Sequence, residues 1–152
     1  MTYRPWIEAG YRCVIQLPVQ WGDQDAMGHV NNTVPLRWFE SARIAYLEQS
    51  GVASALAGEG LGPILASLQC DYRRQVRYPD QVWVGARVVA LGNSSFRMQH
   101  AAWSQQQQAL VTEGSSILVV FDYRAQRPQR VPPSVRQLLE HFEGRSLEPA
   151  SS

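Results

Sequence analysis

The chain has 152 residues, of which 45% are hydrophobic and 18% are charged, as expected for one globular domain with a single core. Fourteen basic and 13 acidic side chains give a formal net charge of +1, which argues against a protein that neutralises many nucleic-acid phosphates. No apolar run has the length of a signal peptide or a membrane span, so we expect a cytoplasmic protein with no membrane partner.

The two cysteines, Cys13 and Cys70, lie far apart in the sequence and form no C-x-x-C pair. This spacing favours neither a zinc site nor a redox pair. We therefore expect two buried thiols in a reducing compartment.

The first predicted element is a strand over residues 11–20, which are rich in β-branched and aromatic side chains. Pro18 indicates that this strand ends there or lies at a sheet edge. A polar loop follows, and after it Asn31 or Asn32 is placed to cap the N-terminus of a helix over residues 34–48.

The predicted helix has two faces at 100° per residue. One is apolar and comprises Val34, Trp38, Phe39, Ala42, Ala45 and Tyr46. The other is polar and comprises Arg37, Glu40, Ser41, Arg43 and Glu48. Leu36, Ile44 and Leu47 interrupt the polar face, so we expect the helix to be covered on more than one side. Gly51 is suited to end it in the left-handed conformation.

The remaining chain reads as a Gly-rich connection, four strands and a short helix. The connection covers residues 57–63, and the strands are predicted over residues 64–76, 82–91, 95–103 and 110–123. Pro132 and Pro133 open an amphipathic terminal helix, and residues 145–152 read as a disordered tail.

Strands that follow one another without intervening helices pair in antiparallel fashion. A single long helix beside such a sheet must be its main apolar partner. The sequence therefore predicts an α+β domain in which an antiparallel sheet wraps around one long central helix. The apolar stretch 117–121 is a candidate for strand pairing across a dimer.

The loop over residues 21–32, W-G-D-Q-D-A-M-G-H-V-N-N, concentrates acidic, polar and turn-forming residues. Counted from Asp23, its D-x-D order and Gly28 at the sixth position resemble the start of an EF-hand. Met27 at the fifth position and Val34 at the twelfth exclude that motif, because calcium needs oxygen ligands there.

Asp25 stands a few residues before the predicted helix start, where unpaired backbone N–H groups favour negative charge. Such N–H groups can stabilise an oxyanion, while a carboxylate facing the same carbonyl attacks it or activates a water. Spacing alone favours the plainer role of a cap or turn former. A metal site made from Asp23, Asp25 and His29 also stays open, as does an orienting role for His29.

Elsewhere the chain has no G-x-S-x-G serine elbow and no phosphate-binding loop. It does have a basic cluster, Arg73, Arg74 and Arg77, which suits a small anionic ligand or simply marks a solvated strand end. His100 and His141 have no partner suggested by the sequence.

The segment from Val19 to Leu47, V-Q-W-G-D-Q-D-A-M-G-H-V-N-N-T-V-P-L-R-W-F-E-S-A-R-I-A-Y-L, closely resembles the signature of hotdog-fold acyl-CoA thioesterases of the 4-hydroxybenzoyl-CoA thioesterase type. Asp71 to Val84 is similar to that family's second and third strands. The resemblance implies a single hotdog domain over residues 1–144 and an acyl-CoA substrate, with no cofactor beyond its coenzyme A. It also implies a homodimer or a dimer-of-dimers tetramer with the active site between subunits.

The resemblance further implies a role for individual residues. Asp25 matches the catalytic carboxylate, as nucleophile or general base, and Asn32 matches the helix start whose backbone N–H polarises the thioester carbonyl. His29 is the third catalytic candidate, and it would also shape the loop or line the pocket. Gly28 and Asn31 would shape the loop or line the pocket, and Asp23 would organise the turn. Arg73, Arg74 and Arg77 become candidates for contacts with coenzyme A phosphates.

Two other functions stay open on the same fold. One is a non-catalytic module that binds or senses acyl-CoA. The carboxylate in the loop argues against this function, because a passive binder does not need it. The other is a dehydratase acting on enoyl-CoA, for which the expected helix-borne motif is absent. The sequence does not indicate the length of the acyl chain or whether aromatic or aliphatic acyl groups are preferred. It also does not indicate whether the acyl carrier is coenzyme A or acyl carrier protein. Trp38, Phe39 and Leu65 are guesses for the acyl end of the pocket.

Overall fold

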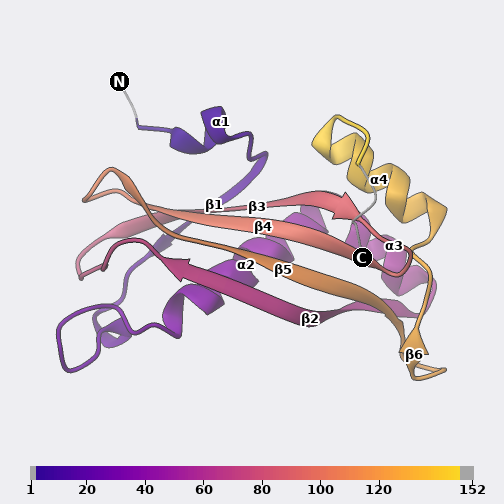
Figure 1. The fold of residues 1–152 in the computed structure, drawn as a ribbon, viewed down its shortest axis with the longest axis horizontal. Helices are drawn as coiled ribbons and strands as arrows, with labels where there is room; N and C mark the ends of the chain where they lie inside the picture. The colour runs from indigo at the N-terminus through magenta and orange to yellow at the C-terminus, as the bar shows by residue number, and fades with distance from the viewer. Residues whose placement is uncertain (1–2, 148–152) are drawn as a thin grey trace.

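A curled antiparallel sheet covers one long helix, α2 (Val34–Gln49), in a computed structural model that describes residues 3–147 (Figure 1). The long strands are β1 (Cys13–Pro18), β2 (Leu61–Tyr72), β3 (Gln81–Leu91), β4 (Ser95–Ser104) and β5 (Ala109–Asp122), in the spatial order β1-β3-β4-β5-β2. The short strand β6 (Arg127–Pro128) pairs with β5. The predicted α+β hotdog architecture is confirmed.

Alternation along the strands decides which side chains meet α2. In β3, Val82, Val84 and Ala86 are fully buried, whereas Trp83 and Arg87, on the opposite face, are only partly covered. The helix contacts β1, β3 and β4 in the residues described. These three strands are neighbours at one side of the sheet, and the core between them and α2 continues onto Val111, Leu118 and Val120 of β5 and onto side chains of α3 and α4.

The prediction for the central helix is confirmed to within one residue at its end, and Phe39, Ala42 and Tyr46 are fully buried on its apolar face. Arg43 was expected on the polar face, and that expectation is wrong, because its side chain is only 6% exposed. Leu47 is buried as well, so the helix is indeed covered on a second side.

That second cover comes from elements the sequence did not predict. Gly51 takes φ +84° and ends α2 as expected, but the chain turns directly into α3 (Val52–Gly58), which buries Val52 and Leu56. A further unpredicted helix, α1 (Pro5–Ala9), lies near the other end of the sheet. Both helices are shorter than eight residues, too short for their periodicity to show in the sequence.

Two strand predictions need correction. The strand expected over 64–76 ends at Tyr72, because the N–H groups of Arg73 and Arg74 both turn to the carbonyl of Val111. The stretch 117–121 cannot pair across a dimer, since it belongs to β5, whose two edges are occupied by β4 and β2. The edge of β2 that faces away from β5 is instead a free edge among the described residues.

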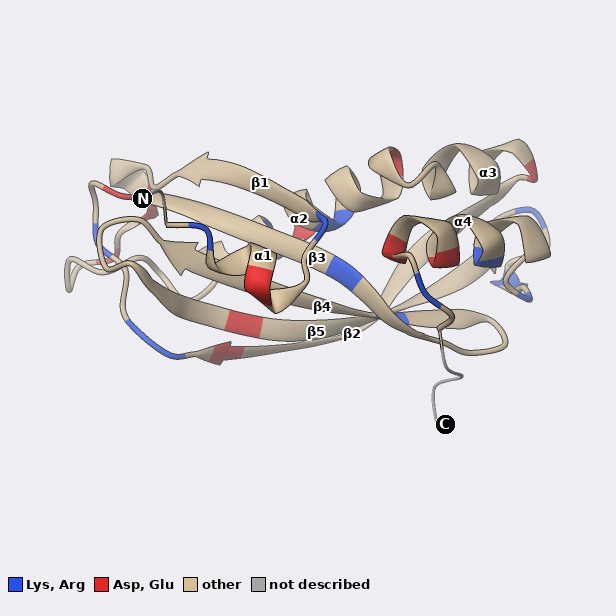
Figure 2. Cartoon of the chain, turned by 90° about the horizontal axis from the view of Figure 1, so that it is seen from above, with Lys and Arg blue, Asp and Glu red and all other residues tan. Residues whose placement is uncertain are grey.

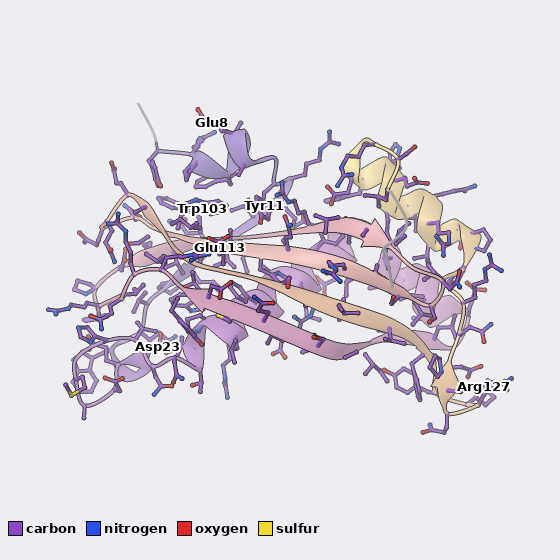
Figure 3. All side chains as sticks on the ribbon, viewed as in Figure 1. Glu8, Tyr11, Asp23, Trp103, Glu113 and Arg127 are labelled. Atoms are coloured by element: carbon purple, nitrogen blue, oxygen red, sulfur yellow. The ribbon has the colours of Figure 1, made fainter. Side chains whose placement is uncertain are left out.

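The N-terminal segment covers the outer face of the sheet with aromatic rings. Trp6 of α1 packs on Trp83 and Trp103, at centroid distances of 5.0 and 6.2 Å. Tyr11 was expected to lie in the first strand, but β1 begins at Cys13, and Tyr11 packs over Gly85 and Trp103 instead (Figure 3). Gly85 leaves the room that this ring occupies, because a Cβ there would lie 2.7 Å from it.

The C-terminal helix α4 (Pro133–Glu143) begins at the predicted proline pair and buries Val135 and Leu139. Ordered packing continues past residue 144, since Leu147 is buried and its N–H donates to Glu140 at 2.8 Å. Residues 148–152 of the predicted tail lie outside the described part of the chain. Within residues 3–147, every helix is too short or too polar to cross a lipid bilayer.

Both cysteines are free, but only one of them fits the expectation of a buried thiol. Cys13 is 1% exposed, and burial together with the Glu143 charge raises the pKa of its thiol to about 11. Cys70 is only partly buried, so that part of the prediction is wrong. It lies on β2, beyond the strands that α2 covers most closely.

Candidate active site

The loop between β1 and α2 is held in place by its own hydrogen bonds. It opens with a turn of 3₁₀ helix, η1 (Trp21–Asp23), and Figure 3 shows Asp23 there, near the start of α2. The Asp23 carboxylate accepts from the Gln20 N–H at 2.8 Å, and the Asp23 carbonyl accepts from the Asn31 N–H at 2.9 Å. Asp23 therefore organises the turn, as expected.

Asp25 forms a second, tighter turn within this loop. Its N–H donates to the His29 carbonyl at 2.8 Å, and its own carbonyl accepts from the Gly28 N–H at 3.0 Å. Gly28 takes φ +79°, which a residue with a side chain rarely adopts. The carboxylate oxygen Oδ1 accepts from the Met27 N–H at 2.9 Å, while Oδ2 has no partner among residues 3–147. One oxygen of this exposed carboxylate is thus available to a substrate or a water.

The helix start differs from the predicted cap. Thr33, rather than Asn31 or Asn32, is the N-cap residue of α2. Asn31 contributes through its side chain, whose Oδ1 accepts from the Thr33 N–H at 2.9 Å and from the Thr33 hydroxyl at 2.7 Å. The Asn31 carbonyl accepts from Val34 at 3.0 Å. The N–H groups of Asn31 and Thr33 therefore both have acceptors, the Asp23 carbonyl and the Asn31 side chain. The N–H of Asn32, between them, has no partner in the described part of the chain.

A cavity of about 560 Å³ opens where the loop, the start of α2 and the end of β2 meet. Asp25, His29 and Asn32 line it from the loop, and Tyr72, Arg73 and Arg74 line it from the opposite side. Gly28 and Asn31 shape the loop without lining the cavity. The structure thus brings all three predicted catalytic candidates to one cavity, together with two of the three predicted arginines.

The three arginines have different surroundings. Arg73 forms an ion pair with Glu113 at 2.9 Å, with both side chains about half exposed, so the pair adds little stability. Arg77 lies outside the cavity lining, and its Nη2 is 3.0 Å from Nε2 of His29. Because a guanidinium only donates, this hydrogen bond is made with Nε2 of His29 as the acceptor. Figure 2 shows basic residues directly beyond the end of β2.

Tyr72 is one of the lining residues that the sequence did not predict as part of the site. Its hydroxyl donates to the Asn32 carbonyl, 40 residues away. The alternation of side chains along the strand could have indicated Tyr72, because it places Tyr72 on the same face as Leu68 and Cys70. The prediction instead carried the strand through to residue 76. Trp38, Phe39 and Leu65, the guesses for the acyl end, do not line the cavity.

His100, in contrast to His29, is buried in the interior of the protein. Its ring stacks on Phe39 at 5.1 Å, and Nε2 lies 2.8 Å from the Ser116 hydroxyl. Burial, and secondarily the Arg43 charge, lower the pKa of His100 to about 3. Nδ1 of His100 and Nη1 of Arg43 are buried without a hydrogen-bond partner in residues 3–147. No group of three or more His, Cys, Asp or Glu side chains in those residues could hold a metal ion.

Comparison with known proteins shows the family of this chain and structures that share its fold. The family model described as the thioesterase-like superfamily matches residues 19–139, which is most of the chain. A thioesterase from Thermus thermophilus, whose crystal structure contains coenzyme A and zinc, is 33% identical and superposes with a TM-score of 0.80 over 91% of this chain and 98% of that one. A thioesterase-superfamily structure from Jannaschia sp. CCS1 is 26% identical, with a TM-score of 0.81 over 91% and 87% of the two chains.

A curated relative matches this chain over a shorter stretch. YsmA from Bacillus subtilis is 28% identical over 100 residues. The match spans 66% of this chain and 66% of YsmA, slightly less than two thirds of the relative's length.

Proposed function

The chain belongs to the thioesterase-like superfamily, and on that basis we propose that it hydrolyses an acyl-CoA thioester to a free acid and coenzyme A. One observation carries the proposal. A carboxylate with a free oxygen, Asp25 Oδ2, and an unpaired backbone N–H, that of Asn32, belong to residues lining the same cavity in the described chain. Acyl transfer needs these two groups, a nucleophile or base and an oxyanion donor.

In the proposed reaction the thioester carbonyl oxygen accepts a hydrogen bond from the Asn32 N–H. Asp25 then attacks the carbonyl carbon or removes a proton from a water that attacks it. The negative charge that develops on the oxygen is stabilised by the N–H and by the positive end of α2. The C–S bond breaks, and the thiolate leaves readily because a thiol is far more acidic than an alcohol. Water supplies the oxygen of the acid, directly or by hydrolysis of an acyl-aspartate.

Coenzyme A is the proposed carrier of the acyl group. The Thermus thermophilus thioesterase, 33% identical, was crystallised with coenzyme A, and the cavity here has Arg73 and Arg74 on its lining. A guanidinium suits phosphate through paired donors. Arg77 is a weaker candidate for this contact, because it already binds His29.

A second copy of the chain is the proposed partner, as a homodimer or a dimer-of-dimers tetramer. The free edge of β2 carries Leu65, which is 41% exposed, and the cavity lies at the end of this strand. A copy paired along the edge would bring its own residues to the cavity mouth. Because both cysteines are free, the cytoplasm stays the proposed compartment.

The test is Asp25→Asn, assayed by thiol release from a panel of aliphatic and aromatic acyl-CoAs. Loss of a positioned base should lower turnover by about 10²- to 10⁴-fold. Asp71→Asn is the matched control, because this carboxylate lies on β2 but does not line the cavity. Unchanged turnover in Asp25→Asn would refute the role of Asp25. Saturable acyl-CoA binding without thiol release by the wild-type protein would favour the non-catalytic module instead.

A further inference from the structure

The segment that begins at the last residue of β2 and covers residues 72–78 runs along the site loop and bonds to it at four points. The Tyr72 hydroxyl donates to the Asn32 carbonyl, the Val76 carbonyl accepts from the Val30 N–H at 2.8 Å, Arg77 donates to His29 at 3.0 Å, and the Tyr78 N–H donates to the Gln24 side chain at 3.2 Å. We call this segment the clamp. It ties the loop to the sheet at residues spread along the loop's length.

Among these contacts, the one from Tyr72 acts on the peptide group that follows the proposed oxyanion donor. The peptide joining Asn32 to Thr33 is bonded at both ends, since its carbonyl accepts from Tyr72 and its N–H donates to Asn31. A peptide group is planar, so two bonds in different directions fix its orientation. The Asn32 N–H belongs to the preceding peptide, whose carbonyl, that of Asn31, accepts from the Val34 N–H, so the direction of the Asn32 N–H is set from both sides of the residue.

We propose that Tyr72 is a positioning residue of the thioesterase reaction. Its hydroxyl holds the peptide between Asn32 and Thr33, and in this way keeps the Asn32 N–H directed at the thioester carbonyl. The inference rests on the proposed function. Tyr72 acts through Asn32 and makes no contact with the reacting atoms. Its bond spans 40 residues of sequence and links the end of the sheet to the start of α2.

The chemistry of the hydroxyl agrees with this role. Although the Tyr72 side chain is 49% exposed, loss of water around the hydroxyl and the neighbouring Cys70 thiol raise its pKa to about 12. The hydroxyl therefore keeps its proton at neutral pH and donates to Asn32 throughout the working range. It is unsuited to act as a base, which leaves Asp25 as the residue for that step.

Tyr72→Phe separates positioning from folding. The ring and its packing remain. Because Asn32 and Tyr72 are both exposed, water can bond to the released Asn32 carbonyl. The melting temperature should therefore stay close to that of the wild type. Loss of an oxyanion donor costs about 10²- to 10³-fold, and a donor that is present but misdirected should cost less, roughly 10-fold or more in kcat. KM should change little, because the hydroxyl is already occupied by Asn32 and is not needed to bind the substrate.

The control is Tyr123→Phe. Tyr123 is 52% exposed and lies in the hairpin between β5 and β6, at the end of the sheet where Figure 3 shows Arg127, away from the loop. This variant should keep the wild-type kcat and KM. A Tyr72→Phe enzyme with wild-type kcat would overturn the proposal, and so would a raised KM at unchanged kcat, which would make Tyr72 a substrate contact instead.

A second measurement does not depend on turnover. In ¹⁵N-labelled protein, Tyr72→Phe should shift or broaden the amide signals of Asn32 and Thr33, while Tyr123→Phe should leave them in place. Unchanged amide signals would show that the hydroxyl does not hold this peptide. Absence of thiol release by the wild-type protein would refute the thioesterase function itself, and the amide signals would still decide whether Tyr72 fixes Asn32.

Discussion

The hydroxyl of Tyr46 joins three elements through one carboxyl group. It donates to Oε2 of Glu143 in α4 at 2.6 Å, and the same oxygen accepts from the Val88 N–H of β3 at 3.1 Å. Tyr46 is fully buried and Glu143 is 7% exposed, so water cannot replace a lost donor. Burial and the Glu143 charge raise the pKa of Tyr46 above its ordinary value, which keeps the hydroxyl a donor.

Tyr46→Phe removes this donor and keeps the ring, which also packs edge-on against Phe142 at 4.8 Å. A hydrogen bond to a charged group contributes about 1.5–3 kcal/mol, and here its loss leaves the carboxyl group with the Val88 N–H alone. For a chain of this length, each kcal/mol lowers the melting temperature by roughly 2–4 °C. We therefore expect a decrease of roughly 4–8 °C, for a loss of about 2 kcal/mol.

The assay is thermal unfolding followed by circular dichroism, with all proteins at the same protomer concentration because self-association would raise the midpoint. Tyr123→Phe serves as the control, since its exposed hydroxyl should be dispensable for stability. Thiol release per folded molecule should not change in Tyr46→Phe, because Tyr46 does not line the cavity. A midpoint equal to that of the wild type would refute the assignment of this bond as a link between α4 and the core.

Two further variants test the packing and the buried histidine. Gly114→Ala should cost about 1–3 kcal/mol, because its Cβ would lie 2.3 Å from the Gln69 carbonyl oxygen and 2.9 Å from a Phe39 ring carbon. The measurement is the urea midpoint of unfolding. Gly58→Ala is the control, because a Cβ at Gly58 meets no other atom, and its midpoint should equal or exceed that of the wild type. Equal midpoints for the two variants would contradict the close packing at Gly114. His100 is held neutral, with a pKa of about 3 against 6.5 in the unfolded chain, so stability present above pH 6.5 is lost as the pH falls toward 3. The loss should be about 1.4 kcal/mol per pH unit below 6.5, and His100→Phe should abolish it; the same pH dependence in both proteins would exclude His100 as its source.

The parts of the site that could be predicted are those made by neighbours in sequence. Asp23 bonds to Gln20 and Asn31, and Asp25 bonds to Met27 and His29, all within eight residues. Such turns depend on local backbone preferences, so the residue types reveal them. The exact helix cap was missed by one or two positions, because three adjacent polar residues can each fill that place.

The errors follow from contacts that the sequence does not display. Arg43 lies where an isolated amphipathic helix would face water, yet it is buried in the folded chain, where its charge acts on His100 of β4. The apolar run 117–121 looked like an edge that pairs between subunits, whereas the strand order places it inside the sheet. Periodicity reports which side chains avoid water, but not which element covers them.

The order of residues along the chain was enough to establish the family, the antiparallel sheet over one long helix, and the loop that carries Asp25, since these depend on local pattern and short-range hydrogen bonds. What faces that loop was settled by the folded chain alone. Tyr72 and Arg77 reach Asn32 and His29 across 40 and 48 residues, and no spacing in the sequence relates such positions. They meet because β2 ends beside the start of α2, and that arrangement comes from the order of the strands in the folded sheet.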